Sequence, residues 1–208
     1  KIAIKYKIKY IFSGSNYVTE GILPTAWGYD ASDYYHIKKV HKIFGTKKIK
    51  TFPKMPLLKY FDNLIIKGIK KIPILNYLDY NKSDAIKELN KKVGWKYYGG
   101  KHYESVFTQF FQAHVLPHKF KIDKRKAHLS TLICSGQISK EEALMELEKP
   151  LYNKSLLDEH THYFLKKFEI SKNEYNTIME QKPLQHLHYP SNNYLIQKAL
   201  KFKKLFIQ

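Results

Sequence analysis

Apolar residues in the first part of the chain follow a strand pattern and then a helix pattern. Residues 8–12 form a short β-prone run that ends in the small polar turn Ser13-Gly14-Ser15-Asn16, which is typical of a buried strand. Residues 19–29 contain glycine and proline and indicate an ordered loop. Apolar side chains recur at helical spacing over residues 33–44, so we predict a helix that ends at Gly45.

A second strand signal and a second helix signal follow. Residues 70–75 resemble a short edge strand or an extended turn, because Pro73 cannot donate a hydrogen bond within a sheet. Residues 83–93 predict a helix with Asn81 or Ser83 as its cap and Gly94 as its stop.

The second half of the chain has mainly helical signals. Apolar residues occupy one face over residues 103–116, and we expect Pro117 to end this helix because proline lacks an N–H. Residues 194–208 form a basic amphipathic segment, either a helix or a frayed tail. Three capping boxes or near relatives predict further helix starts, at Ser139, Ser155 and Ser171.

The composition is that of an ordered protein without a membrane segment. The chain has 208 residues, of which 43% are hydrophobic and 26% charged. No apolar run approaches the roughly 20 residues that cross a bilayer, and lysines interrupt the apolar residues at the start, so no secretory signal forms. Cys134 is the single cysteine, which excludes an internal disulfide. We therefore expect a cytoplasmic protein.

The net charge of +19 would suit nucleic-acid binding, but its make-up argues against it. Arg125 is the only arginine among 37 basic residues, and proteins that read bases or clamp phosphates favour the arginine fork. We therefore expect solvated lysines and no specific nucleic-acid partner. An arginine in so lysine-rich a chain indicates a position where lysine does not suffice.

Two polar clusters could carry chemistry. The first runs from Ser13 to Gly21, where a turn after a strand lets backbone amides approach a phosphate; the alternative is an ordinary turn. The second contains Gly99-Gly100-Lys101-His102 before a helix start, where cations are unfavourable unless an anion is bound. Its alternative is a solvated turn with a Lys101–Glu104 pair.

Two other kinds of site are not expected. Cys134 lies in an apolar context, where cysteine is more often a small buried side chain than a nucleophile. The histidines of the C-terminal half lack acidic residues at ligand spacing, so no metal site is predicted there; they are His160, His162, His186 and His188.

Long motifs of this chain resemble those of the N-acetyl sugar amidotransferases. They are residues 13–24 (Ser-Gly-Ser-Asn-Tyr-Val-Thr-Glu-Gly-Ile-Leu-Pro), Trp27-Gly28-Tyr29-Asp30, Gly99-Gly100-Lys101-His102-Tyr103-Glu104-Ser105, Asp123-Lys124-Arg125, His128-Leu129-Ser130 and Ile133-Cys134-Ser135-Gly136-Gln137-Ile138. The resemblance runs from about residue 8 to residue 190. That family serves lipopolysaccharide O-antigen and flagellin-glycan pathways, including those of pseudaminic acid.

The resemblance implies an α/β fold: a partial PP-loop nucleotide-binding domain, similar to adenine nucleotide alpha hydrolases, followed by a mostly helical C-terminal region. Residues 1–98 would form the nucleotide-binding part, and residues 99–208 the helical part that completes the site. The implied enzyme uses ATP and Mg²⁺ to turn the acetamido group of a nucleotide-activated sugar into an acetamidino group. Ammonia would come from a glutaminase subunit related to that of histidine biosynthesis, alongside a cyclase-like subunit.

The resemblance also implies roles for individual residues. Catalysis of attack by a weakly nucleophilic amide oxygen depends on positioning and on cations at the leaving pyrophosphate. The residues assigned to catalysis are Lys101, His102, Glu104 and Arg125. Those assigned to ATP and Mg²⁺ are Ser13, Gly14, Asn16, Glu20, Lys124 and Ser135. Replacing Arg125 by alanine would then reduce turnover without unfolding the enzyme.

One departure from the family changes the expectation. Family members carry a pyrophosphate-binding loop of the Ser-Gly-Gly-Lys-Asp-Ser type and cysteine pairs, and the chain contains neither. We therefore expect a truncated chain with weak ATP binding and no catalysis alone. Alternatives are a tRNA-modifying PP-loop enzyme, for which one cysteine is too few, a basic RNA-binding module, and a non-catalytic assembly subunit.

Overall fold

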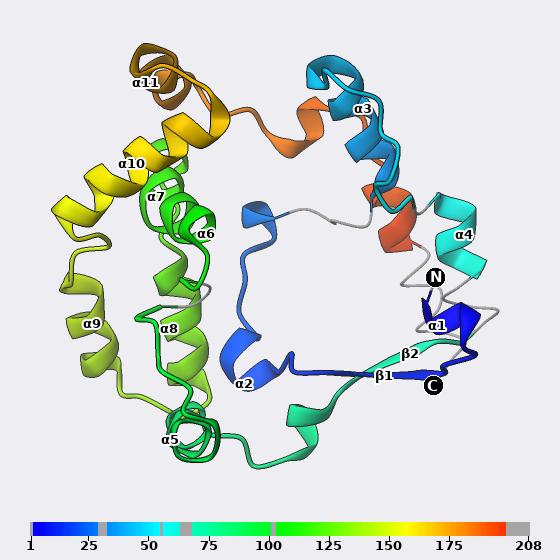
Figure 1. The fold of residues 1–208 in the computed structure, drawn as a ribbon. Coiled ribbons are helices and arrows are strands. Elements are labelled where there is room, and N and C mark those ends of the chain that lie inside the picture. The colour runs from blue at the N-terminus through cyan, green and yellow to red at the C-terminus, as the bar shows by residue number, and fades with distance from the viewer. Residues whose placement is uncertain (1, 29–32, 55, 63–67, 101–102, 199–208) are drawn as a thin grey trace. The chain divides into compact units, whose positions relative to one another are not determined.

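The computed structural model describes residues 2–28, 33–54, 56–62, 68–100 and 103–198. These residues are mostly helical, with a two-stranded parallel sheet (Figure 1). The expected α/β architecture is therefore met only in part, and a PP-loop domain is not shown. The chain divides into two compact units. Unit 1 comprises residues 1–14, 25–73 and 184–208; unit 2 comprises residues 15–24 and 74–183.

The sheet of unit 1 pairs the two segments that the sequence predicts as strands. β1 (Tyr10–Ser13) runs parallel to β2 (Lys70–Pro73), with Tyr10 opposite Lys70 and Ser13 opposite Pro73. The prediction of a buried strand is wrong, because Phe12 is 69% exposed. Two strands alone cannot bury a face, and no third strand joins them in the part of the chain described. The short helix α1 (Ile2–Lys5) precedes β1.

The predicted helix over residues 33–44 is confirmed as α3 (Tyr34–Phe44), which Asp33 caps and Gly45 ends. The Asp33 carboxylate is 2% exposed and accepts hydrogen bonds from the His36 N–H, the Ser191 hydroxyl and the Asn192 N–H. Burial raises the pKa of this carboxyl, and the three hydrogen bonds lower it by more than burial raises it. The net pKa therefore lies below the ordinary value. An ionised Asp33 thus ties residues 191–192 to α3.

The remaining described elements of unit 1 are short. They are η1 (Thr25–Trp27), α4 (Leu57–Phe61), η5 (His186–His188) and a helical stretch over residues 193–198. This last stretch shows that the predicted amphipathic segment starts as a helix, with Ile196 buried; its remainder lies outside the described residues.

Unit 2 begins with α2 (Tyr17–Glu20), which replaces part of the predicted loop, and continues with η3 (Ile74–Tyr77). α5 (Lys82–Val93) confirms the helix predicted over residues 83–93. Of the two proposed caps, Asn81 is the one used, and it accepts from the N–H groups of Ser83 and Asp84. Gly94 ends α5 with a φ of 66°, the left-handed conformation that glycine adopts without strain.

The helix around Pro117 differs from the prediction. α6 (Val106–Phe110) continues through a π-helical turn, η4 (Phe111–Val115), into α7 (Leu116–Phe120), so Pro117 does not end it. Proline is tolerated in the first turn of a helix, and the change of hydrogen-bond pattern at η4 makes Pro117 such a first-turn residue.

The core of unit 2 forms where this long helix meets the last two helices, α10 (Lys154–Phe168) and α11 (Lys172–Glu180). Phe110, Val115 and Tyr175 are its buried members, and Phe164 and Leu165 of α10 pack against them. Two of the three capping boxes are confirmed, at Ser139 and Ser171. The box expected at Ser155 is wrong, because Asn153 caps α10 two residues earlier.

His114 makes the stability of this core dependent on pH. Its Nε2 lies 3.0 Å from the Tyr175 hydroxyl, and its buried Nδ1 has no hydrogen-bond partner in the described residues. Burial first, and then the charges of His118 and Lys172, lower the pKa of His114 to about 4. The folded state therefore holds this ring neutral, and protonation favours the unfolded chain.

Stability is expected to be complete above pH 6.5 and to fall as the pH decreases towards 4, because only the unfolded chain binds the proton in that window. Because solvent screens the partly exposed ring, the free energy of unfolding is expected to fall by only about 1–2 kcal/mol. Urea unfolding at several pH values measures it. His114→Gln should flatten the curve relative to wild type, whereas the exposed control His162→Gln should not; equal slopes in all three would contradict the assignment.

Candidate functional site

The segment of residues 15–24 lies against α8 (Lys124–Cys134), and hydroxyl groups of the α8 region hold its backbone. The Thr131 hydroxyl accepts from the Ile22 N–H at 3.1 Å and donates to the Ala127 carbonyl at 2.9 Å. The Ser135 hydroxyl donates to the Val18 carbonyl at 2.9 Å. Residues 15–24 of the first motif therefore meet the motifs at residues 128–130 and 133–138 within unit 2. Ser13 and Gly14 of the first motif belong to unit 1.

A lysine and a histidine lie at the centre of this contact. His128 Nδ1 is 3.2 Å from the Thr19 carbonyl oxygen, and His128 Nε2 is 3.1 Å from Lys82 Nζ. Because a carbonyl oxygen only accepts, Nδ1 carries the proton and Nε2 of the neutral ring accepts from the lysine. We call Lys82 and His128 the Lys–His pair.

Gln137 fixes the start of α5, where Lys82 is located. Its side-chain amide donates to the Tyr80 carbonyl and accepts from the Lys82 N–H, each at 3.1 Å. The Lys82 ammonium also lies 5.9 Å from the centre of the Tyr97 ring, within range of a cation–π contact. A positioned cation next to a neutral imidazole can stabilise an anion and transfer a proton.

Asn16 has a local structural role. Its side-chain oxygen caps α2 by accepting from the Thr19 N–H and the Thr19 hydroxyl. The Asn76 side chain accepts from the Tyr17 N–H at 2.9 Å and so holds the start of the same helix. These bonds set the path of the chain towards Glu20, an exposed carboxylate of this segment.

Arg125 occupies all five of its N–H groups with protein acceptors. Its Nε and one terminal nitrogen bind the Asp123 carboxylate, with the closest contact at 2.9 Å. Both terminal nitrogens of the guanidinium also donate to carbonyl oxygens at the end of α9 (Lys140–Glu148). These oxygens belong to Glu146, Leu147 and Lys149. The geometry gives Arg125 a helix-capping role, and contact with pyrophosphate stays a prediction.

Two tyrosines, Tyr103 and Tyr152, lie in the neighbourhood of Arg125 and His160. Burial raises the pKa of Tyr103, the charge of Arg125 lowers it and that of Asp123 raises it, so Tyr103 lies within electrostatic range of both side chains. Burial and the neighbouring Tyr103 raise the pKa of Tyr152 to about 12, and its hydroxyl lies 2.7 Å from His160 Nδ1.

The predicted site residues thus fall into three groups. Ser13 and Gly14 belong to unit 1; Lys101 and His102 lie outside the described residues. The others belong to unit 2 and are Asn16, Glu20, Glu104, Lys124, Arg125 and Ser135.

Two further predictions concern Cys134 and metal binding. Cys134 is exposed rather than buried, which corrects the prediction; α8 ends at this residue, so no further helical turn covers it. The described ranges contain no group of three histidine, cysteine or acidic side chains placed to hold a metal ion. Mg²⁺ is commonly held by one or two carboxylates together with substrate phosphates, and the assignment of Glu20 to Mg²⁺ stays a prediction.

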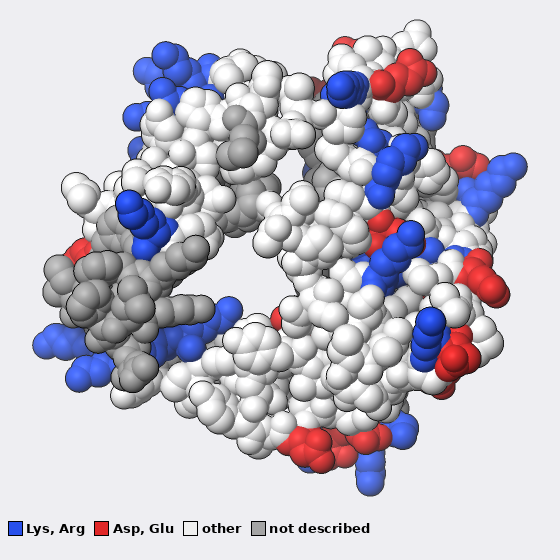
Figure 2. Space-filling model, turned by 180° about the vertical axis from the view of Figure 1, so that it is seen from behind, with Lys and Arg blue, Asp and Glu red and all other residues white. Residues whose placement is uncertain are grey.

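The surface charge and the apolar character of the helices bear on binding to nucleic acid and to membranes. On the face in Figure 2, the basic residues stand in several groups, and acidic residues lie beside those on the right side and at the bottom of the view. The absence of a specific nucleic-acid partner stays a prediction. No helix within the described residues has both the length and the apolar character that a bilayer crossing requires.

Sequence reasoning did not assign four residues to the site: Lys82, His128, Thr131 and Gln137. Lys82 follows a helix cap and looked like a solvated lysine, so no local signal distinguished it. Gln137 and His128 belong to quoted motifs, and a polar side chain within such a motif was the available signal.

Comparison with known proteins concerns the C-terminal half. Residues 104–203 match the family model described as LPS biosynthesis protein WbpG-like, C-terminal domain. No curated protein and no solved structure matches the chain significantly. The matched region contains α8, with His128 and Arg125, and the core around Phe110. In residues 104–203, this chain is similar to the C-terminal domain of a lipopolysaccharide-biosynthesis family, which supports a role in that biosynthesis.

Proposed function

We propose that the protein is an ATP-dependent amidotransferase of surface-polysaccharide biosynthesis. It converts the N-acetyl group of a nucleotide-activated sugar to an acetamidino group. The family match at residues 104–203 supports the biosynthetic role. The observation that carries the reaction is the gathering of separate amidotransferase-like motifs around α8 by Thr131, Ser135 and His128.

The proposed reaction has two steps. The amide oxygen of the sugar attacks the α-phosphorus of ATP, the bond to pyrophosphate breaks, and an adenylated imidate forms. Ammonia then adds to the imidate carbon, the carbon–oxygen bond breaks, and AMP leaves with that oxygen. A partner glutaminase supplies the ammonia alongside a cyclase-like subunit, and Mg²⁺ accompanies the phosphates.

The Lys–His pair fits the demands of these steps. Negative charge grows on the departing phosphates, and the ammonium of Lys82 is a cation that His128 and Gln137 position. The incoming ammonia must lose a proton, and the neutral imidazole takes it up through Lys82, which passes its hydrogen-bonded proton to Nε2 and receives the proton that ammonia loses. Lys101, His102, Glu104 and Lys124 remain proposed contributors, with Glu20 near the metal.

A genetic test asks whether the chain acts in this way in the cell. Deletion of its gene in the organism that encodes it should remove acetamidino groups from the surface polysaccharide. Mass spectrometry would show the acetamido form, which carries oxygen in place of NH. Wild-type complementation should restore the amidine. His128→Asn keeps a donor at the position of Nδ1 but lacks Nε2, and should lower the amidine content by on the order of 10².

The matched control is His162→Asn, because His162 is an exposed histidine of α10. It should restore the wild-type polysaccharide. An unchanged polysaccharide in the deletion strain would refute the proposed function. Full activity of a stably produced His128→Asn protein would remove the Lys–His pair from the site.

A further inference from the structure

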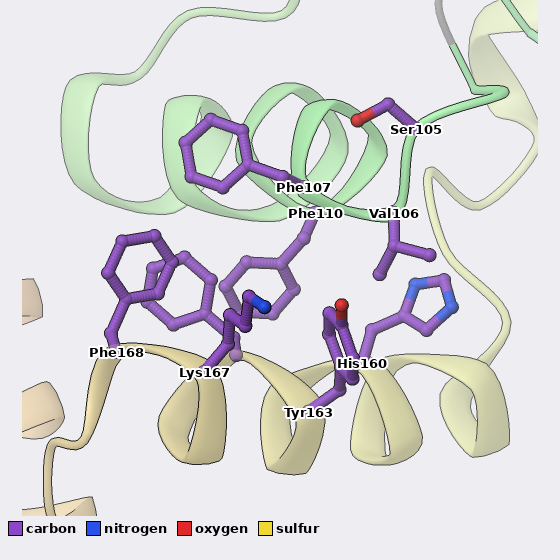
Figure 3. Close-up of a pocket in the computed structure, with 9 residues that line it drawn as sticks. Ser105, Val106, Phe107, Phe110, His160, Tyr163, Lys167 and Phe168 are labelled. Atoms are coloured by element: carbon purple, nitrogen blue, oxygen red, sulfur yellow. The ribbon is translucent and has the colours of Figure 1, made fainter.

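Unit 2 contains a concave site between α6 and α10 (Figure 3), and its lining includes neither residue of the Lys–His pair. Its volume is about 350 Å³, which lies within the range of small-molecule sites. Residues 160, 163, 164, 167 and 168 recur at helical spacing and therefore share one face of α10. Val106, Phe107 and Phe110 of α6 form the opposite wall. We call this site the aromatic hollow.

The walls of the aromatic hollow hold large aromatic side chains that are open to solvent. Phe107, Tyr163 and Phe168 are 49%, 51% and 50% exposed. The Phe107 ring lies nearly parallel to that of Phe164, at 14° and 6.1 Å between centres, and 5.9 Å from that of Phe168. Half-exposed aromatic rings in a concave site offer stacking surfaces for a flat ring.

The charge of the aromatic hollow selects an anion. Lys167 is the charged residue of its lining, no acidic side chain lines it, and Lys167 forms no ion pair with any described residue. In Figure 3 its amine lies between the rings of Phe168 and Tyr163. At one end of the lining is His160, whose Nδ1 is held by the Tyr152 hydroxyl.

We propose that the aromatic hollow binds a nucleoside phosphate, with the base stacked on Phe107 and Phe168 and a phosphate at the Lys167 ammonium. A flat ring joined to an anion matches both features of the lining, and base–aromatic stacking tolerates any base. This second site goes beyond the proposed function. Only the choice of probes rests on that function, which offers two sources of such a ligand: AMP and the nucleotide of an activated sugar, for which uridine diphosphate serves as the probe.

Calorimetric titration of the full chain with AMP and, separately, with uridine diphosphate tests the proposal. We expect one or both nucleotides to bind. Phe168→Ala should weaken binding about tenfold, because one stacking contact is lost. Lys167→Ala should weaken it about fivefold and reduce its dependence on salt, and Lys167→Glu should weaken it further.

Two matched controls lie outside the lining. Lys166→Ala removes the neighbouring exposed lysine of α10, and Phe44→Ala removes an exposed phenylalanine of α3. Both should bind as wild type does, and circular dichroism should show that all variants fold. Binding of AMP alone or of uridine diphosphate alone identifies which of the two sources the site serves.

Three results would overturn the proposal. The first is that neither nucleotide binds. The second is that wild type, Phe168→Ala and Lys167→Glu bind equally well. The third is a concentration-dependent self-association of the chain that Phe168→Ala abolishes. The last result would assign the aromatic hollow to a second copy of the chain. Because the titration involves neither ammonia nor turnover, its failure leaves amidine formation in the cell as a separate measurement.

Discussion

Replacing Phe110 by alanine is expected to lower the free energy of unfolding by about 3–5 kcal/mol. Phe110 has no exposed surface, and its ring centre lies 4.8 Å from that of Phe164 and 6.3 Å from that of Tyr175. Three helices meet at this ring, so its removal leaves a cavity that a small helical core cannot close by moving one side chain. Urea unfolding followed by circular dichroism measures the loss.

Phe107→Ala is the control on the same helix. Phe107 is 49% exposed, so its truncation should cost only about 1 kcal/mol. Similar losses in the two variants would mean that Phe110 is not the centre of the core. If Phe110→Ala is too unstable to purify, Phe110→Leu should still unfold at a lower urea concentration than Phe107→Leu.

Replacing Arg125 by alanine is expected to lower the free energy of unfolding by about 2–4 kcal/mol. The Arg125 side chain is 23% exposed, and the change leaves the Asp123 carboxylate and the last carbonyl groups of α9 without their donors. Arg125→Lys should recover less than half of the loss, because an ammonium cannot reproduce the planar fork. Urea unfolding of both variants gives the two values.

This measurement also separates two interpretations of the same residue. The sequence predicted that Arg125 contacts pyrophosphate and that its loss spares the fold, whereas the structure shows a guanidinium engaged with α9. Lys149→Ala is the control, since its exposed pair with Glu146 should contribute less than about 1 kcal/mol. An Arg125→Ala protein as stable as this control would favour the catalytic interpretation.

Local rules predicted those elements whose ends depend on neighbouring residues. α3 and α5 were found because a glycine ends each helix, and the two capping boxes because a serine is followed three residues later by a glutamate. The exposure of Phe12 could not be predicted in this way, since a β-prone run looks the same whether or not another layer covers it. Ser155 satisfied the capping pattern, but Asn153 offered an earlier cap.

The candidate site was predictable as a set of motifs and not as a geometry. Spacing alone did not show that Thr131 holds the backbone of Ile22, because this contact spans more than a hundred residues. The sequence marked the lone arginine as a position where lysine does not suffice, and the partners of its fork are the Asp123 carboxylate and carbonyl oxygens of the chain itself. Composition identifies an unusual residue, and long-range packing determines what it binds.

The π-helical turn at η4 has a consequence for the angular phase of the helix that follows it. Each residue of an α-helix advances the direction of its side chain by about 100°, so one additional residue per turn rotates everything after it. Lys119 of α7 donates hydrogen bonds to the carbonyl oxygens of Ile178 and Gln181 at the end of α11. The wide turn sets the rotation at which this lysine meets α11, so losing a single residue there would turn the lysine aside while leaving the helix itself unbroken.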